Sequence, residues 1–324
     1  MVKTRRHRRN LIHWQLERGT RNATIEDVTY LAAVLVLLAS LTQASSFQSD
    51  PPHKCSDCDT WNKPREPFKI FGNTYFVGTD GLSAILVVGD AGHILLDGGL
   101  EQSAALIDAN IRKLGFKLQD VKLIVNSHGH FDHAGGIHAL QRASGATVAA
   151  SNSGADALRR GENTTDDPQF GFGKEFNGFP PVKDVKVIRD GDVQRVGNLA
   201  ITPNFTPGHT PGSTTWTWQT CEGTRCLNMV YADSISAVSA PGFRFTDRPE
   251  LVAQMRRSIT RVGELPCDIV VSTHPSATNL DGKVKKRAEL KGAGPDPFVD
   301  HGCKALAAAA MKGLEARLAE EKKK

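Results

Sequence analysis

The amino-acid sequence predicts a mixed α/β (α+β) fold made of two halves, each containing strands followed by helices. Three observations predict it. Short β-type runs separated by turns rich in Gly and Asp open each half, segments with helical periodicity follow, and each half contains a continuous apolar run typical of a strand buried on both faces. No matching sequence repeat accompanies the pattern, so the duplication is a prediction about structure alone.

The first half is expected to open with a meander of three short strands. Turns of sequence Gly-Thr-Asp-Gly and Gly-Asp-Ala-Gly separate these runs. Apolar residues then recur at helical spacing up to Gly115, which is a plausible stop, and a buried strand follows. The expected ranges are strands at 74–77, 84–88 and 93–96, a helix at 103–114, and the buried strand at 121–125.

The second half repeats this plan. The expected ranges are strands at 185–189, 199–202, 214–219 and 229–232, a helix at 249–263, a buried strand at 268–273, and an Ala-rich helix at 303–321. Between the halves lies the segment 161–182, rich in Gly, Pro, Phe and Asp. Irregular segments of that length in compact domains are usually functional.

The overall composition is that of a globular protein. The 324 residues are 40% hydrophobic and 23% charged, which excludes a disordered, collagen-like or coiled-coil chain. The net charge of +5 is concentrated at the N-terminus, because residues 1–30 carry seven basic and three acidic side chains. The remaining residues have a net charge near +1, so no nucleic-acid partner is expected.

The N-terminus has the pattern of a secretory signal. An apolar run at 31–42 follows the basic stretch and ends in Thr42-Gln43-Ala44, with small residues at the positions that a signal peptidase reads. The run is too short to span a bilayer comfortably, which takes about 20 apolar residues. We expect residues 1–44 to be removed and residues 45–324 to form a single domain in the periplasm or outside the cell. An uncleaved membrane anchor is the alternative, and no other membrane contact is expected.

All six cysteines lie in the expected mature region, where an oxidising compartment favours disulfides. Other connectivities stay open, as does a redox or zinc role for the first CxxC motif, although no second CxxC is present to complete a zinc site. The pairs favoured by spacing are Cys55–Cys58 and Cys221–Cys226, which leaves Cys267 for Cys303.

Five histidines occur at three places, each after an expected strand. His128, His130 and His133 lie with Asp132 within six residues, while His209 and His274 come later. Neutral imidazole and carboxylate are the ligands that zinc prefers, and this density is far above ordinary surface usage. Small residues such as Gly129 allow the sharp turns that let several side chains converge. The pattern therefore predicts a metal site.

The run from His128 to His133, written HxHxDH, resembles the metallo-β-lactamase superfamily when taken with the later Gly-His and His274. The resemblance implies a four-layer αββα sandwich with the metal site at one shared edge. It also implies two Zn²⁺ ions, the first held by His128, His130 and His209 and the second by Asp132, His133 and His274. Three protein ligands per metal are typical of catalytic zinc.

Across residues 55–310 the chain is similar to the third subclass (B3) of class B β-lactamases. This subclass uses no cysteine ligand and implies a disulfide between Cys267 and Cys303, with the hydroxyls of Ser234 and Ser236 binding the substrate carboxylate. The runs that carry the similarity are Trp61-Asn-Lys-Pro64, Leu96-Asp-Gly-Gly99, Tyr231-Ala-Asp-Ser-Ile-Ser236 and Leu265-Pro-Cys-Asp268.

The resemblance implies a monomeric hydrolase that opens the β-lactam ring of penicillins, cephalosporins and carbapenems with a zinc-bound hydroxide, which Asp132 would orient. A lactonase or thioesterase of the same superfamily is the alternative. Such relatives bridge their metals with an aspartate, and Asp233 lies near that position. We interpret Asp233 as structural. A zinc scaffold without activity is disfavoured by the complete set of six ligands.

Overall fold

The computed structural model describes residues 47–323. The expected signal peptide and its boundary at residue 44 therefore lie outside the described residues. Within the described part of the chain, no helix combines the length and the apolar character needed to cross a bilayer.

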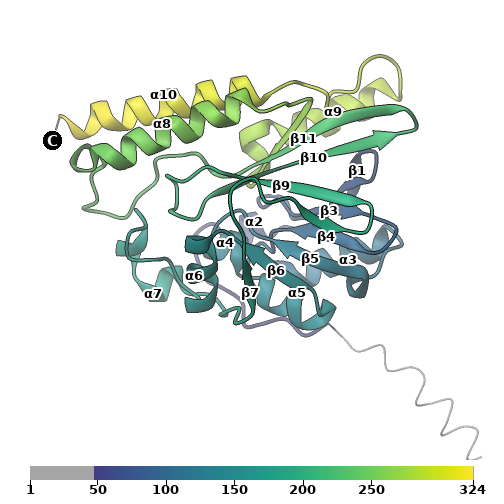
Figure 1. The fold of residues 1–324 in the computed structure, drawn as a ribbon, viewed down its shortest axis with the longest axis horizontal. Coiled ribbons are helices and arrows are strands. Elements are labelled where there is room, and N and C mark those ends of the chain that lie inside the picture. The colour runs from purple at the N-terminus through teal and green to yellow at the C-terminus, as the bar shows by residue number, and fades with distance from the viewer. Residues whose placement is uncertain (1–46, 324) are drawn as a thin grey trace, which may run out of the picture. The chain divides into compact units, whose positions relative to one another are not determined.

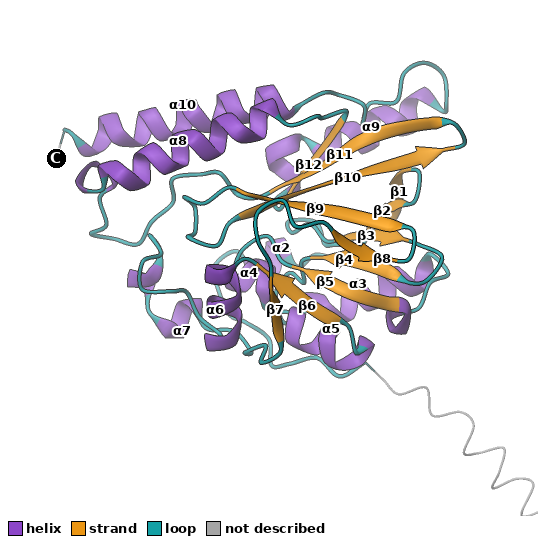
Figure 2. Cartoon of the chain, in the orientation of Figure 1, coloured by secondary structure: helices purple, strands orange, loops and turns teal. Residues whose placement is uncertain are grey.

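Seven strands form the first sheet, in the order of the chain (Figure 2). The first four pair antiparallel and the last four pair parallel, with the fourth strand belonging to both sets. The strands are β1 (Phe68–Phe71), β2 (Thr74–Phe76), β3 (Ile85–Val88), β4 (His93–Leu96), β5 (Val121–Val125), β6 (Thr147–Ala150) and β7 (Val185–Val187).

Five strands form the second sheet in the order β12-β11-β10-β9-β8. Consecutive strands from β8 to β11 pair antiparallel, and β12 pairs parallel with β11. The strands are β8 (Gln194–Val196), β9 (Leu199–Phe205), β10 (Thr214–Glu222), β11 (Arg225–Ala232) and β12 (Ile269–Ser272).

The two sheets share a plan. In each, a meander of four antiparallel strands is followed by a helix and then by a strand parallel to the fourth. The helix is α3 (Ser103–Lys113) in the first half and α8 (Pro249–Glu264) in the second. This strand order agrees with the predicted structural duplication. In both halves the loop after the parallel strand carries predicted ligands, His128 after β5 and His274 after β12.

Helices cover the outer faces of the two sheets, which gives the predicted four layers (Figure 1). The helices α3 and α5 (Ile137–Ser144) pack on the outer face of the first sheet, and α8 and α10 (Cys303–Glu321) run side by side above the second in this view. The other helices are α2 (Cys58–Trp61), α4 (Phe131–Ala134), α6 (Asn152–Arg160), α7 (Lys174–Asn177) and α9 (Leu280–Leu290). Short 3₁₀ turns occur at Leu118–Asp120, Phe170–Phe172, Phe245–Asp247 and Pro275–Thr278.

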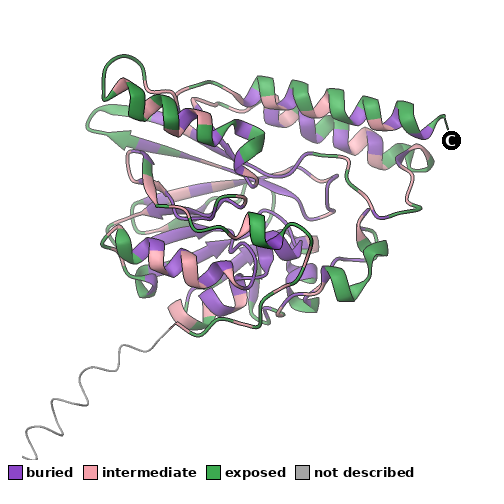
Figure 3. Cartoon of the chain, turned by 180° about the vertical axis from the view of Figure 1, so that it is seen from behind, coloured by how far each residue is buried: buried purple, intermediate pink, exposed green. Residues whose placement is uncertain are grey.

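Apolar side chains fill each of the three spaces between layers. The two sheets face each other across a core that contains the fully buried Phe76, Trp216 and Tyr231. On α8, buried apolar residues such as Val252 and Ile259 recur at helical spacing and pack toward the second sheet and α10. Figure 3 shows these buried inner faces against exposed outer helix faces. Burying one such side chain stabilises the fold by about 1.5–3 kcal/mol.

Three strands are absent from the sequence prediction, namely β1, β6 and β8. The prediction also ends β10 too early and starts β11 too late. These two strands extend as a hairpin beyond the core, pairing Glu222 with Arg225 at its tip. Exposed polar residues at that tip lack the alternating apolar pattern by which a strand is recognised.

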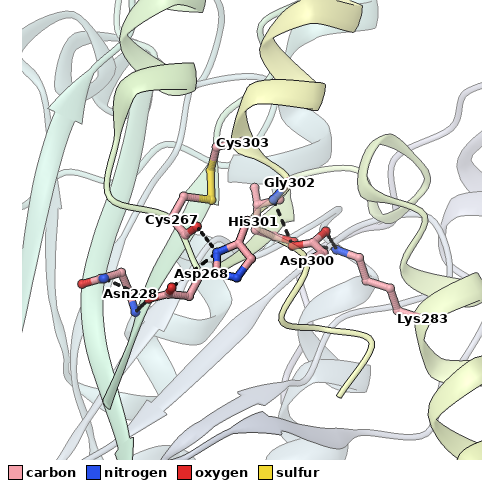
Figure 4. The surroundings of a disulfide bond; sticks show 9 residues. Asn228, Cys267, Asp268, Lys283, Asp300, His301, Gly302 and Cys303 are labelled. Carbon is pink, nitrogen blue, oxygen red and sulfur yellow. Dashed lines mark hydrogen bonds and ion pairs between the residues drawn. A yellow bond between two sulfur atoms is a disulfide. The ribbon is translucent and has the colours of Figure 1, made fainter. Parts of the chain in front are cut away.

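The six cysteines form three disulfides in the pairing favoured by their spacing: Cys55–Cys58, Cys221–Cys226 and Cys267–Cys303. The third joins the segment before β12 to the start of α10 (Figure 4). Hydrogen bonds reinforce this junction, since the backbone N–H of His301 donates to the carbonyl oxygen of Asp268 (3.1 Å). The start of α10 is therefore fixed to the second sheet.

Candidate metal centre

The structure brings all six predicted ligands together from three segments of the chain. His128 and His130 lie between β5 and α4, and α4 itself carries Asp132 and His133. His209 follows β9 and His274 follows β12. Five of the six residues are buried, and His274 is half-buried.

Two glycines let these loops pack closely. A Cβ on Gly129, between His128 and His130, would lie 2.5 Å from the Cβ of Ala157 in α6. Gly208, which precedes His209, has φ +148°, and a Cβ there would lie 2.4 Å from Met255 in α8. Larger residues at either position would push a ligand loop away from its supporting helix.

The first group of ligands is His128, His130 and His209. Their nearest ring nitrogens lie within 4.8 Å of one another, so a single ion could contact all three. The ring centroids are 4.6–5.0 Å apart. This is the set that the family resemblance implies for the first zinc.

The second group contains His128, Asp132 and His133, again within 4.8 Å. His274 lies beside them, since its Nε2 is 3.4 Å from Asp132 Oδ2 and its ring centroid is 4.9 Å from that of His133. His128 thus lies beside both groups, but because its Nδ1 faces Asp233, its one free nitrogen, Nε2, can bind only a single ion. Trp61, which the sequence analysis did not select as a site residue, packs against His274 with ring centroids 5.5 Å apart.

Four of the histidines have a hydrogen-bond acceptor on one ring nitrogen. Since a carboxylate or carbonyl oxygen accepts, the nitrogen that faces it carries the proton and the opposite nitrogen keeps its lone pair for a metal. The pairs are His128 Nδ1 with Asp233 Oδ1 (2.6 Å), His130 Nε2 with Asp167 Oδ2 (3.0 Å), His209 Nδ1 with Ser236 O (3.0 Å) and His274 Nδ1 with Gly81 O (3.3 Å).

Several buried polar atoms at the centre have no hydrogen bond within the described chain. They include Nε2 of His128 and both ring nitrogens of His133. An unsatisfied buried polar atom costs about 1–3 kcal/mol, so a fold that gathers several of them is explained by a ligand that satisfies them. Imidazole nitrogens with one carboxylate fit zinc.

The ionisation of these residues suits metal binding. Burial, aided by neighbouring imidazoles, lowers the pKa of His209 to about 3 and that of His128 well below its usual range. Burial alone would raise the pKa of Asp132, but the imidazoles of His133 and His274 outweigh it and hold the pKa well below its ordinary value. Neutral imidazoles and an ionised carboxylate are the forms that bind metal at neutral pH.

Asp233 contacts His128 at Nδ1, the ring nitrogen opposite the free Nε2. Its carboxylate is fully buried and its Oδ1 is occupied by His128, while Oδ2 has no hydrogen bond. Burial raises its pKa well above the ordinary value. In this geometry Asp233 orients His128, which agrees better with the structural role than with a bridge between metals.

Asp97 holds the start of the histidine loop, a role that the sequence analysis missed. Its carboxylate accepts hydrogen bonds from Asn126 Nδ2, Ser127 N, Ser127 Oγ and Tyr231 Oη at 2.7–3.0 Å. The residue adopts φ +61°, which is uncommon outside glycine. A lone carboxylate directly after a buried strand is the signal that could have revealed it.

The two predicted substrate serines differ in exposure. Ser234 is buried, with its Oγ 2.9 Å from Thr273 Oγ1. Ser236 is exposed, and its Oγ lies 3.3 Å from His209 Nδ1. Ser236 is therefore the serine that presents its hydroxyl to solvent beside the centre.

A cavity of about 880 Å³ adjoins the metal centre. It reaches Asp167, the partner of His130, and Pro211, two residues after His209. Its other walls are the loop around Phe170, the segment 240–244 and the first turns of α8. The predicted ligands themselves do not line it.

The chain was compared with known proteins. The family model of the metallo-β-lactamase superfamily matches residues 77–274. The Rm3 metallo-β-lactamase is 51% identical with a TM-score of 0.79 over 83% of this chain and 99% of that one. MEM-A1, a subclass B3 metallo-β-lactamase from a soil metagenome library, is 47% identical with a TM-score of 0.77 over 81% of this chain and 98% of that one.

A more distant similarity is to the acyl-coenzyme A thioesterase MBLAC2 of Gallus gallus. It is 32% identical over 102 residues, which are 28% of this chain and 35% of that protein. The chain thus spans about a third of the length of the curated relatives it matches. The matched family model covers more than half of this chain and includes every predicted ligand. The chain therefore belongs to the metallo-β-lactamase superfamily.

Proposed function

We propose that the protein is a zinc-dependent hydrolase that opens the β-lactam ring of penicillins, cephalosporins and carbapenems. The observation that carries the proposal is the convergence of six buried or half-buried ligands at one site. The sequence is also 47–51% identical to those of enzymes described as metallo-β-lactamases. Two Zn²⁺ ions would be held, one by His128, His130 and His209 and the other by Asp132, His133 and His274.

Zinc bound here would supply a nucleophile at neutral pH and polarise the lactam carbonyl. The protein's own residues do the rest. Asp233 and Asp167 accept the ring protons of His128 and His130 and so fix which nitrogen points into the site. Asp132, whose carboxylate is ionised, would accept a hydrogen bond from the attacking water and orient it.

The hydroxyl of Ser236, with Ser234 two residues earlier, would bind the substrate carboxylate. Ser236 supports this role because its side chain is exposed and lies beside His209. A hydroxyl donating to a carboxylate makes a charge-assisted hydrogen bond, which is stronger than a neutral one.

A thioesterase or lactonase is the second candidate, favoured by the similarity to the acyl-coenzyme A thioesterase. A panel of a penicillin, a carbapenem, a lactone and a thioester separates the two. We expect turnover of the β-lactams, loss with EDTA, recovery with zinc and little effect of inhibitors that trap a serine acyl-enzyme. Turnover of the thioester or lactone alone would contradict the proposal, as would hydrolysis that survives exhaustive chelation.

We further propose that the protein acts as a monomer in the periplasm or outside the cell. Three disulfides with no free cysteine in the described chain suit an oxidising compartment. Sequencing the N-terminus of the exported protein would test the expected removal of residues 1–44.

A further inference from the structure

The segment 237–247 leads from the substrate serines to the start of α8 and has little structure of its own. It contains one 3₁₀ turn, Phe245–Asp247, and contacts the loop opposite it through a backbone hydrogen bond from Ala240 N to Pro168 O (3.0 Å). Residues 240–244 of this segment form one wall of the 880 Å³ cavity beside the metal centre. Something outside the segment must therefore hold that wall.

The last turn of α10 supplies the contacts. Glu321 is buried, and its Oε2 accepts hydrogen bonds from the backbone N–H (2.8 Å) and the hydroxyl (3.0 Å) of Thr246. The carbonyl oxygen of Glu321 accepts a further hydrogen bond from the guanidinium of Arg244 (2.6 Å). Burial alone would raise the pKa of Glu321, but the hydrogen bonds from Thr246 and Arg317 lower it to about 2, so the carboxylate is ionised at neutral pH.

Arg317, one turn earlier on α10, completes the contact. Its Nε donates to Glu321 Oε1 (2.6 Å), and its Nη2 donates to Ser239 Oγ (2.8 Å) and to the carbonyl oxygen of Phe243 (3.3 Å). The guanidinium also lies 5.4 Å from the ring centroid of the fully buried Phe245. Two side chains thus bind the segment at four of its residues.

The other end of α10 is anchored by its own contacts. The disulfide Cys267–Cys303 and the bonds around His301 fix its start to the base of β12 (Figure 4). Along its length α10 packs against α8. The helix therefore connects the second sheet to the cavity wall.

We propose that Arg317 and Glu321 are positioning residues that hold the 237–247 segment, and with it the cavity wall, in the conformation that binds substrate. The inference rests on the proposed function. Neither side chain contacts the predicted ligands, so their effect falls on substrate binding and leaves the metals and the chemical step intact.

Glu321→Ala tests this, with Glu315→Ala as the matched control. Glu315 lies on the same helix and pairs with Arg256 of α8 (2.8 Å), away from the segment. For Glu321→Ala we expect the KM for penicillin to rise roughly 3- to 10-fold, the range set by losing one or two hydrogen bonds, with kcat and zinc content unchanged. Glu315→Ala should leave KM unchanged.

Hydrogen exchange of the peptide amides over 239–247 is the second measurement. Glu321→Ala should speed exchange there, above all at Thr246, whose N–H donates to Glu321. Glu321→Gln keeps an acceptor oxygen and should give a smaller change; it also replaces the Ala variant if that one does not fold. Unchanged KM and unchanged exchange, as in the control, would overturn the inference. If the unaltered protein hydrolyses no β-lactam, the proposed function fails and exchange alone decides whether the contact holds the segment.

Discussion

The histidines from the two halves of the molecule are held by different kinds of acceptor. His128 and His130, from the first half, bond to the carboxylates of Asp233 and Asp167. His209 and His274, from the second half, bond to backbone carbonyl oxygens. A carboxylate acceptor makes the imidazole a stronger metal ligand, and a single substitution can remove it. A backbone carbonyl acceptor stays in place under substitution as long as the backbone keeps its path.

Some of these partners also cross between the halves. Asp233, from the second half, holds His128 of the first, and the carbonyl oxygen of Gly81, from the first half, accepts from His274 of the second. Ser83 donates to the carbonyl oxygen of Ser272 (2.7 Å) close by. The centre therefore forms only when the two sheets have packed, although one half carries four of the six ligands.

The largest expected effect is the loss of ligands. His128→Ala removes a buried ligand of the first ion, so we expect that zinc to be lost and penicillin hydrolysis to fall to background. His274→Ala removes a half-buried ligand of the second ion, so the second zinc should be lost and the first retained. Zinc content and penicillin kinetics of the two proteins measure both effects. His138→Ala is the control, because His138 pairs with Asp50 outside the centre. Two tightly bound zinc ions in either ligand variant would contradict the ligand assignment.

The next largest effect is expected from the two carboxylates that accept hydrogen bonds from the ligand histidines. Asp233→Asn and Asp167→Asn keep the size of the side chain but weaken the acceptor, and changes of this kind typically lower metal affinity about 10- to 100-fold. Zinc competition with a chelator measures the affinity. Both ions should still bind when zinc is in excess. A variant of Asp233 that cannot take up a second zinc at any concentration would favour the bridging role of the lactonases and thioesterases.

The serines should affect substrate and spare the metals. Replacing Ser234 and Ser236 together with alanine removes the hydrogen bond from the exposed Ser236 hydroxyl to a charged group, worth about 1.5–3 kcal/mol, so the KM for penicillin should rise roughly 10- to 100-fold. The carbonyl oxygen that holds His209 belongs to the backbone and stays in place. A normal KM with reduced zinc content would mean that these hydroxyls support the metal site and do not bind substrate.

The smallest effect concerns the metal-free protein and pH. The folded-state pKa of His209, about 3, lies below the usual value of 6.5, so folding favours the neutral imidazole. The resulting contribution to the free energy of unfolding is present above pH 6.5. It is lost as the pH falls from 6.5 toward 3, because the unfolded chain then binds the proton more readily than the folded chain. Thermal unfolding of the apoprotein should show a shallower decline over this range in His209→Gln. A decline as steep as in the unaltered apoprotein would count against the lowered pKa of His209.

The dense motif made most of the centre predictable. Four ligands within six residues after a buried strand are visible in the sequence, and His209 and His274 were selected because each follows an expected strand. The family resemblance then assigned all six ligands to the two ions. Their convergence depends on how β9 and β12 pack, which no local pattern records. The partners were harder still, because the Gly81 acceptor is a backbone atom and Asp167 lies in an irregular loop.

The fold was predictable where apolar runs were strong. The ranges of β4, β5 and α10 agree with the prediction to the residue. The strand β6, sequence Thr-Val-Ala-Ala, was missed because alanine has low β propensity, and β8 because Gln194 and Arg195 interrupt any apolar pattern. Both strands form through pairing with neighbours, β6 between β5 and β7 and β8 beside β9.

The most direct test of the account is a zinc titration of the metal-free protein, following penicillin hydrolysis and bound zinc together. The structure gathers the six ligands into two adjacent groups. We therefore expect hydrolysis to rise until two equivalents of zinc are bound and then to stay constant. Full uptake of two zinc ions without penicillin hydrolysis would contradict the proposed reaction, and full activity with no bound metal would contradict the metal centre itself.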